Sequence, residues 1–246
     1  MTDLTLQDRK PQRLRFSESM SRLDAAQKSG VGVPAYTRWV NRRVARYLCA
    51  FAASMGATPA AVSIASIVVT FSGLGLFLAL HRTPLLAGLV AAFLLALGYA
   101  LDSADGQLAR LQGSSSLQGE WLDHTLDSIR IPAVHLTIGA GFLLHGAPAL
   151  VVVAALFTVV ASASFLSQIL GASLRDRSQK DQATVRPFQS WLLLPADTGV
   201  LCWIFVLWAA LPLFGAAYLA LFATNFLHIM LSTRRRWREL GEGVKS

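Results

Sequence analysis

The sequence predicts an all-α integral membrane protein with six transmembrane helices, preceded by an amphipathic helix in the membrane interface. Two observations support this fold class. Hydrophobic residues make up 54% of the 246 residues and charged residues only 15%, whereas soluble domains carry about 25% charged residues. The apolar residues are also gathered in long segments, between which lysine and arginine collect. This composition excludes a soluble globule and a disordered chain.

Six apolar segments are each close to the roughly 20 residues that a helix needs to cross a bilayer. They cover residues 62–80, 85–101, 129–144, 147–171, 191–211 and 213–232, and the third begins further back, near Leu117. None alternates apolar and polar residues, as the strands of a membrane barrel would. Helices are therefore expected throughout, because they satisfy every backbone polar group within the lipid.

Lysine and arginine predict the orientation. Ten precede residue 47, Arg110 ends the second segment, four lie in residues 175–186 and five follow residue 233. Six spans place these 20 of the 22 basic residues on one side, which indicates cytoplasmic termini. The first 30 residues contain no apolar stretch, so no cleavable signal peptide is expected. The preference for arginine over lysine points to a bacterium, and hence to its inner membrane.

The charge pattern divides the chain into four parts. Residues 1–34 form a polar cytoplasmic segment whose first 30 residues are expected to be poorly ordered. Residues 35–57 form the juxtamembrane amphipathic helix, with arginines and an apolar stripe at helical spacing; a soluble helix packed on the domain is the alternative. Residues 58–233 hold the six-helix transmembrane domain, and residues 234–246 form a basic tail suited to lipid headgroups.

Five carboxylates lie within 26 residues around the junction of the second and third segments, where charge is expensive to bury and indicates function. Asp102 and Asp105 share one helix face, and Asp123 and Asp127 share another. The intervening QGSSS is a turn, so both pairs are predicted at the cytoplasmic end of adjacent antiparallel helices. Carboxylate clusters of this kind suit Mg²⁺ or Mn²⁺, and four carboxylates on two helices suit two ions.

These acids belong to a longer pattern. The stretch DSADGQLAR at residues 102–110, followed by Gly119, Asp123 and Asp127 at fixed spacing, resembles the signature of the CDP-alcohol phosphotransferases in all eight positions. The resemblance implies transfer of a substituted phosphate from a CDP-linked donor to an alcohol, with release of CMP. One of the two substrates is a lipid, nucleic acid is not a partner, and a homodimer is expected.

The same resemblance assigns roles to individual residues. Two divalent ions would be held by the four aspartates of the signature, Asp102, Asp105, Asp123 and Asp127. The CDP site would be lined by Asp105, Gly106, Ala109, Arg110 and Gly119.

The general base has two candidates. Asp127 is the usual candidate of the family, in which it would activate the acceptor hydroxyl. The local text GEWLDHTLDS resembles the choline and ethanolamine phosphotransferase branch, and there Glu120 would orient His124 and raise its basicity. His124 is otherwise an interfacial histidine without a catalytic part.

The acceptor site is the least defined. Arg130, one turn past Asp127, would bind an anionic headgroup or pair with an intramembrane acid. Asp197 would line a cavity or pair with Arg130. The basic residues of the loop before the fifth segment would bind an acceptor phosphate or serve as ordinary positive-inside charges; they are Arg175, Arg177 and Arg186.

Three classes of function are open. A metal-dependent transferase is favoured, and its preferred form moves a phosphatidyl group from CDP-diacylglycerol to a soluble polyol or polyol phosphate. The alternative form moves a phospho-alcohol from a soluble CDP-alcohol to diacylglycerol. An ion-coupled transporter also buries acids, but usually spreads them over internal repeats, which are not visible here. The third class is a degenerate member that only binds nucleotide or scaffolds other proteins.

Overall fold

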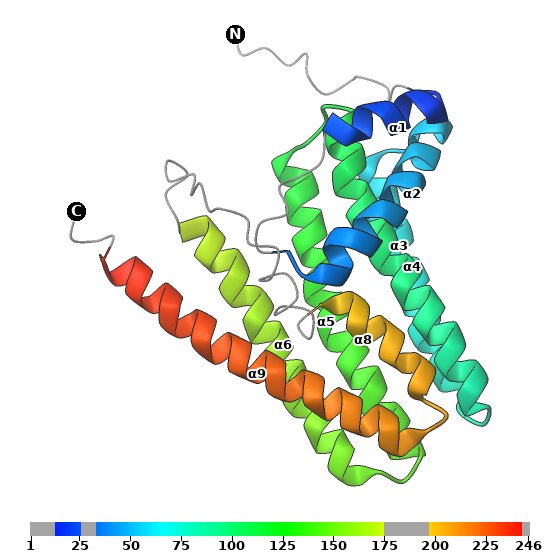
Figure 1. Cartoon of the computed structure of the whole chain (residues 1–246), viewed down its shortest axis with the longest axis vertical. Coiled ribbons are helices and arrows are strands. Elements are labelled where there is room, and N and C mark those ends of the chain that lie inside the picture. Colours follow the sequence, from blue (N-terminus) through cyan, green and yellow to red (C-terminus); the bar gives the residue numbers. More distant parts are fainter. Residues whose placement is uncertain (1–12, 26–32, 175–196, 243–246) are drawn as a thin grey trace.

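The computed structural model describes residues 13–25, 33–174 and 197–242, and every regular element among them is helical. In Figure 1, α3 (Pro59–Ala79) runs along α4 (Pro84–Leu111), and α5 (Leu117–Leu144) packs against α3. Helices α1 (Phe16–Ala25) and α2 (Arg42–Met55) lie at one end of this group. Helices α6 (Pro148–Leu174) and α9 (Leu211–Glu242) pack together beside α5. The predicted all-α class is confirmed.

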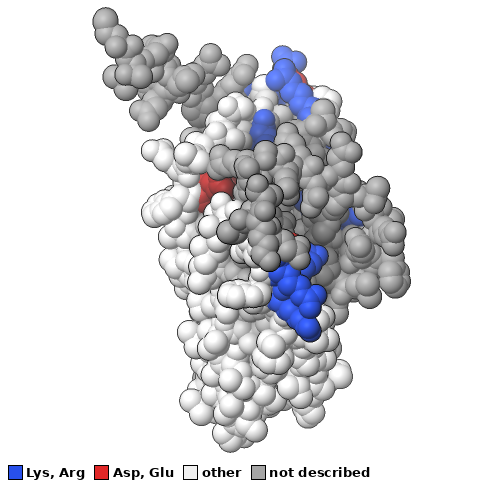
Figure 2. Space-filling view, turned by 90° about the vertical axis from the view of Figure 1, so that its left-hand side faces the viewer, with Lys and Arg blue, Asp and Glu red and all other residues white. Residues whose placement is uncertain are grey.

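Four of the described helices are long and apolar enough to cross a membrane, namely α3, α4, α6 and α9. They correspond to the first, second, fourth and sixth predicted segments. Each begins at or next to a proline. Proline suits the first turn of a helix because backbone N–H groups there have no acceptor within the helix, so the N–H that proline lacks costs no hydrogen bond. On the face shown in Figure 2, the lower part carries no charged side chain among the described residues. These features identify an integral membrane protein.

The other two predicted spans differ from the expectation. Helix α5 begins at Leu117, as predicted, but its charged residues and Pro132 make it less apolar than the four helices above. The described part of the fifth segment forms only α8 (Thr198–Ile204) and a 3-10 turn at Phe205–Leu207, and residues 191–196 lie outside the described residues. The count of six spans therefore stays a prediction.

The N-terminal segment contains a helix that the sequence did not predict. Residues 16–25 were expected to be poorly ordered, yet they form α1, which packs on α2. Leu23 is fully buried, Leu14 is almost so, and the Leu14 N–H donates to the Ala53 carbonyl at 3.4 Å. A few apolar side chains in a polar sequence thus hold this helix in place through contacts with residues that are distant in the sequence.

Residues 35–55 are helical, and the place of this helix in the membrane interface stays a prediction. A π-helical turn at Thr37–Asn41 leads into α2, which ends at Gly56 with a left-handed φ of 72°. One face of α2 buries small side chains against α1 and α4, among them Ala45 and Cys49. The outward face exposes large apolar side chains at helical spacing: Val40, Val44, Tyr47, Phe51 and Met55. The helix therefore packs on the domain by one face and leaves an apolar stripe uncovered.

Two sets of contacts fix the position of α3: one with the segment that follows α8 and one with α4. Far from the acidic residues, Trp208 packs edge-on against Phe77 of α3 and Phe214 of α9, with ring centroids 4.7 Å apart in both pairs. Nearer the acids, α3 and α4 approach closely at Gly98, where a Cβ would lie 3.1 Å from the Ser66 carbonyl oxygen and would collide with Thr70. This close approach brings the polar side of α3 next to the acids of α4.

Candidate active site

A tight turn joins the two helices that carry the acids. Gly113 has a left-handed φ of 62°, and the Ser114 and Gly113 N–H groups donate to the carbonyls of Ala109 at 2.9 Å and Arg110 at 3.2 Å. This is the bonding pattern of a glycine-terminated helix. Ser116 then caps α5 by accepting from the Gly119 N–H at 3.1 Å. The predicted turn is confirmed, and it folds the two acid pairs back toward each other.

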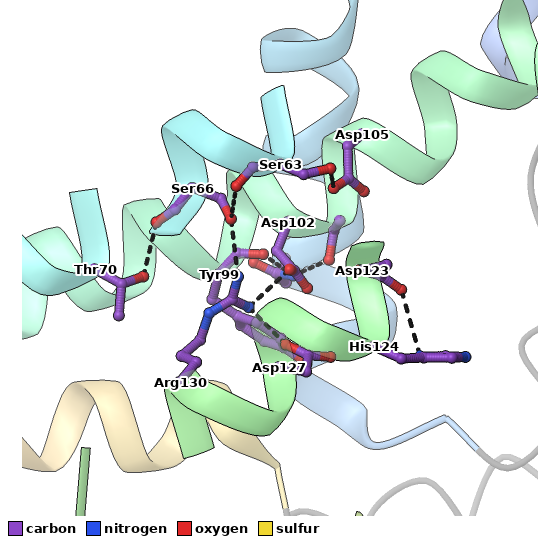
Figure 3. Close-up of polar contacts among 12 residues, drawn as sticks. Ser63, Ser66, Thr70, Tyr99, Asp102, Asp105, Asp123, His124, Asp127 and Arg130 are labelled. Atoms are coloured by element: carbon purple, nitrogen blue, oxygen red, sulfur yellow. Dashed lines mark hydrogen bonds and ion pairs between the residues drawn. The ribbon is translucent and has the colours of Figure 1, made fainter. Parts of the chain in front are cut away.

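Three of the four predicted aspartates converge. Asp102 of α4 and Asp123 and Asp127 of α5 each offer a carboxylate oxygen, and these three oxygens lie within 4.8 Å of one another (Figure 3). Helices α4 and α5 make little backbone contact, and α3 packs against both. The carboxylates therefore meet through their side chains. Three hard oxygen donors at this separation fit a divalent cation such as Mg²⁺ or Mn²⁺.

The fourth aspartate is held apart from this group. Asp105, one turn further along α4, accepts a hydrogen bond from the Ser63 hydroxyl of α3 (Figure 3). It is almost completely buried. The structure thus divides the predicted four-carboxylate cluster into three converging carboxylates and Asp105, which is hydrogen-bonded to α3.

Arg130 points into the carboxylate cluster from α5. Its Nη1 donates to Asp102 Oδ1 at 2.7 Å and to Asp127 Oδ1 at 3.0 Å. Its Nη2 donates to Ser66 Oγ of α3 at 2.8 Å, and the Arg130 side chain is only 8% exposed. Of the two roles left open for Arg130, pairing with an intramembrane acid is the one that the structure displays.

Asp197 connects two segments that are distant in the sequence. Its Oδ1 accepts from the Gly199 N–H at 2.9 Å and thereby caps α8. Asp197 Oδ2 accepts from the Thr37 N–H and Oδ1 from the Thr37 hydroxyl, both at 2.8 Å. Of the two roles left open for Asp197, pairing with Arg130 is wrong, because the Asp197 carboxylate joins α8 to the π-helical turn that leads into α2.

Glu120 and His124 lie beside the cluster. His124 Nε2 is 3.9 Å from Glu120 Oε1, and His124 Nδ1 is 3.9 Å from Asp123 Oδ2. Both distances exceed a hydrogen bond. His124 is partly exposed, and Figure 3 shows its ring beside Asp123 and directed away from Arg130. Both His124 and Asp127 stay candidates for the base.

The residues expected to line the CDP site follow the acids on α4 and open α5. A Cβ at Gly106 would lie 3.4 Å from Arg110 Nη1, and one at Gly119 would lie 3.4 Å from Ser116 Oγ, so both positions have little side-chain cover. Ala109 precedes Arg110 on α4. The three arginines proposed for the acceptor, Arg175, Arg177 and Arg186, lie outside the described residues.

Sequence reasoning missed the contribution of α3. Ser63 and Ser66 hold Asp105 and Arg130, and Thr70 continues the same face. A signal for them was present, since these three hydroxyl residues recur at helical spacing within an otherwise apolar span.

Comparison with known proteins decides the family. The sequence model of CDP-alcohol phosphatidyltransferase matches residues 48–230, a range that contains the acids, Arg130 and the hydroxyl residues of α3. The chain belongs to the CDP-alcohol phosphatidyltransferase family. No curated protein matches it.

Membership of this family establishes the class of activity. The chain is a transferase of substituted phosphate groups that uses a CDP-alcohol and an acceptor in phospholipid synthesis. The family is membrane-embedded and generally depends on divalent metal, which agrees with the four apolar helices and with the aspartate cluster. The transporter and the scaffold alternatives are not supported.

Proposed function

We propose that this chain transfers a phosphatidyl group from CDP-diacylglycerol to the hydroxyl of a soluble polyol or polyol phosphate, with release of CMP. The observation that supports this most strongly is the convergence of three carboxylate oxygens within 4.8 Å next to the start of α5. The cluster belongs to a segment that matches the signature of the family at every position. Arg42, whose carbonyl accepts from the Gln107 side chain of α4, and Arg110, at the end of α4, are two of the basic residues that predict a cytoplasmic side, and both lie at this end.

Two Mg²⁺ or Mn²⁺ ions are proposed at this site, held by the aspartates at positions 102, 105, 123 and 127. When bound, the ions neutralise the pyrophosphate of the donor and the charge that develops as CMP leaves. Asp105, which accepts from Ser63 through one oxygen, has its second oxygen for such an ion or for the donor. Gly106, Ala109, Arg110 and Gly119 are proposed to receive CDP, because small residues admit close approach and a guanidinium binds phosphate.

The acceptor hydroxyl must lose a proton as it attacks phosphorus. Asp127 is one candidate to accept that proton, since it lies in the cluster itself. His124 is the other, since it stands beside Asp123 with a ring nitrogen 3.9 Å from that carboxylate. Either base would take up the proton of the acceptor hydroxyl and would take no part in the phosphorus–oxygen bond that breaks. The acceptor phosphate would be bound by the loop arginines Arg175, Arg177 and Arg186.

In a second candidate function, the lipid is the acceptor and not the donor. In it, a soluble CDP-alcohol donates a phospho-alcohol to diacylglycerol. Glu120 and His124 favour this version, because they stand at one face with 3.9 Å between Oε1 and Nε2 and match the choline and ethanolamine branch in local sequence.

The proposed setting is a bacterial inner membrane, with six spans, cytoplasmic termini and a homodimer. Helix α5 has 28 residues, which gives about 42 Å of helix against a hydrocarbon core of roughly 30 Å. The exposed stripe on α2, which includes Val44, Tyr47 and Phe51, supports a place for α2 in the cytoplasmic interface.

CMP release by the purified full chain in lipid or detergent tests the proposal. CDP-diacylglycerol with a pool of polyols and polyol phosphates is compared with CDP-choline or CDP-ethanolamine plus diacylglycerol, each with Mg²⁺ or Mn²⁺ and with chelator. We expect metal-dependent CMP release from the first set that increases with acceptor. Release only from the second set would establish the second candidate, and the absence of both release and CDP binding would refute the proposal.

The metal site is tested separately by Asp123→Asn, with Glu239→Gln as a control carboxylate on the exposed part of α9. We expect Asp123→Asn to abolish transfer and to weaken metal binding while the protein keeps its helical content. The control is expected to keep both. Full activity of Asp123→Asn would contradict the assignment of the cluster.

A further inference from the structure

We infer that Arg130 is a positioning residue that acts as the internal counter-cation of the aspartate cluster and competes with the divalent cation for the oxygens of Asp102 and Asp127. Arg130 would thereby set the metal affinity of the site. The inference rests on the proposed function, because it presupposes that the cluster binds a divalent cation.

The geometry connects three helices through one guanidinium. From α5, Arg130 Nη1 reaches Asp102 Oδ1 of α4 at 2.7 Å and Asp127 Oδ1 of its own helix at 3.0 Å. Its Nη2 reaches Ser66 Oγ of α3 at 2.8 Å. The rigid planar fork of an arginine fixes these three contacts relative to one another. Arg130 therefore sets the separation of the two carboxylates before any metal arrives.

The charges explain why such a cation is needed. Three carboxylates with oxygens within 4.8 Å of one another repel strongly in a partly buried site. The side chains of Asp102 and Asp127 are only 18% and 25% exposed, so water compensates little of this repulsion. One guanidinium neutralises one of the three charges and leaves a net charge of about −2 on the group. That remaining charge suits a divalent cation.

The same contacts imply competition. Arg130 Nη1 occupies Oδ1 of both Asp102 and Asp127, and these two residues together with Asp123 form the group that fits a metal. Arginine does not lose its proton in proteins, so the guanidinium repels an incoming cation until it moves away from these oxygens. The bond from Nη2 to Ser66 opposes that movement.

A purely structural role would have a different consequence. If Arg130 only held the helices together, its removal would loosen the cluster and leave metal binding weaker or unchanged. A competing counter-cation predicts the opposite, since its removal leaves the full negative charge of the aspartates to the metal. The sign of the change in affinity therefore separates the two roles.

The test measures Mn²⁺ binding by electron paramagnetic resonance with the full-length protein in detergent, after removal of metal and without substrate. We expect Arg130→Gln to bind Mn²⁺ about tenfold more tightly or better, because removal of a unit charge close to the ion is a large electrostatic change. Arg130→Lys keeps the charge and is expected to stay within about threefold of the wild type. Ser66→Ala frees Nη2 and is expected to tighten binding about threefold.

A control variant and a second readout complete the design. His135→Gln, on the same helix, alters a buried side chain whose Nδ1 lies 2.8 Å from the Tyr218 hydroxyl, and is expected to leave Mn²⁺ affinity unchanged. Without metal, Arg130→Gln is expected to melt at a lower temperature than the wild type. Saturating Mn²⁺ should raise its melting temperature more than that of the wild type, because tighter binding to the folded state stabilises it more.

The outcomes separate this inference from the proposed function. Mn²⁺ affinity that is unchanged or weaker in both Arg130→Gln and Ser66→Ala, with binding by the wild type lost in Asp123→Asn, would overturn the role of Arg130 alone. If Arg130→Gln does not fold, Ser66→Ala decides by the same criterion. Absence of Mn²⁺ binding by the wild type would overturn the metal site and this inference together.

Discussion

Gly98 of α4 offers a test of how the structure positions the catalytic residues. A Cβ at this position would collide with the Thr70 hydroxyl and lie 3.1 Å from the Ser66 carbonyl oxygen. Both obstacles belong to α3, and one of them is backbone. Gly98→Ala is therefore expected to push α3 away from α4 at the level of Ser66, and to disturb the Ser66 hydrogen bond to Arg130.

The magnitude follows from a comparison with Gly75→Ala. Gly75 is an exposed residue of α3, and a Cβ added there would meet no neighbour within 4 Å, so alanine is expected to be neutral or stabilising by up to ~1 kcal/mol. Overpacking at Gly98 costs about 1–3 kcal/mol. We expect Gly98→Ala to unfold at lower denaturant concentration than Gly75→Ala and to release CMP more slowly at saturating metal.

Thermal or denaturant unfolding in one detergent, followed by helical circular dichroism, measures the first effect, and a CMP-release assay measures the second. Equal stability and equal activity of the two alanine variants would refute the reasoning. Such a result would mean that the approach of α3 to α4 is looser than the contacts at Gly98 indicate.

Three further predictions concern the base, a buried thiol and the membrane interface. At saturating metal, His124→Ala and Asp127→Asn are expected to differ in their pH–rate profiles. The rate rises with pH as the general base loses its proton, and only removal of the true base abolishes this rise. Unchanged profiles in both variants would exclude both residues as the base. Burial raises the pKa of the Cys49 thiol to about 12, so this thiol stays protonated at pH 8. Cys49 is therefore expected to react with maleimide only after unfolding. Rapid labelling of Cys49 in the folded protein would contradict the packing of α2. Replacement of Tyr47 and Phe51 by serine is expected to increase protease access to α2 in vesicles with little change in metal binding, while equal protection would argue against a lipid contact for the exposed stripe.

Local rules explain why the acidic residues could be located from the sequence. Spacing of three and four residues placed Asp102 and Asp105, and Asp123 and Asp127, in pairs on two helices. Gly113 and the serines after it indicated the turn that brings the pairs together. These inferences need only helical geometry and turn chemistry, and neither depends on what else packs nearby.

Contacts between distant segments explain what the sequence did not predict. The division of the acids depends on Ser63 and Ser66, which approach from α3, 42 and 64 residues away from their partners Asp105 and Arg130. Asp197 meets Thr37 across 160 residues, a pairing for which spacing offers no guide. Helix α1 is held by long-range packing, since Leu23 is buried against residues of α2 and α4.

The position of α1 bears on where the folded unit begins. The match to the family starts at residue 48, within α2, so a boundary drawn from that match would divide α2 and discard α1. It would also remove Thr37, whose hydroxyl lies 2.7 Å from Tyr99 Oη of α4, one turn before Asp102. A shortened chain would thus expose Ala53 and Cys49 to water and remove the two hydrogen bonds that Thr37 donates to Asp197. Expression of an intact enzyme is therefore expected to require α1 and Leu14, which is buried and donates its N–H to the Ala53 carbonyl.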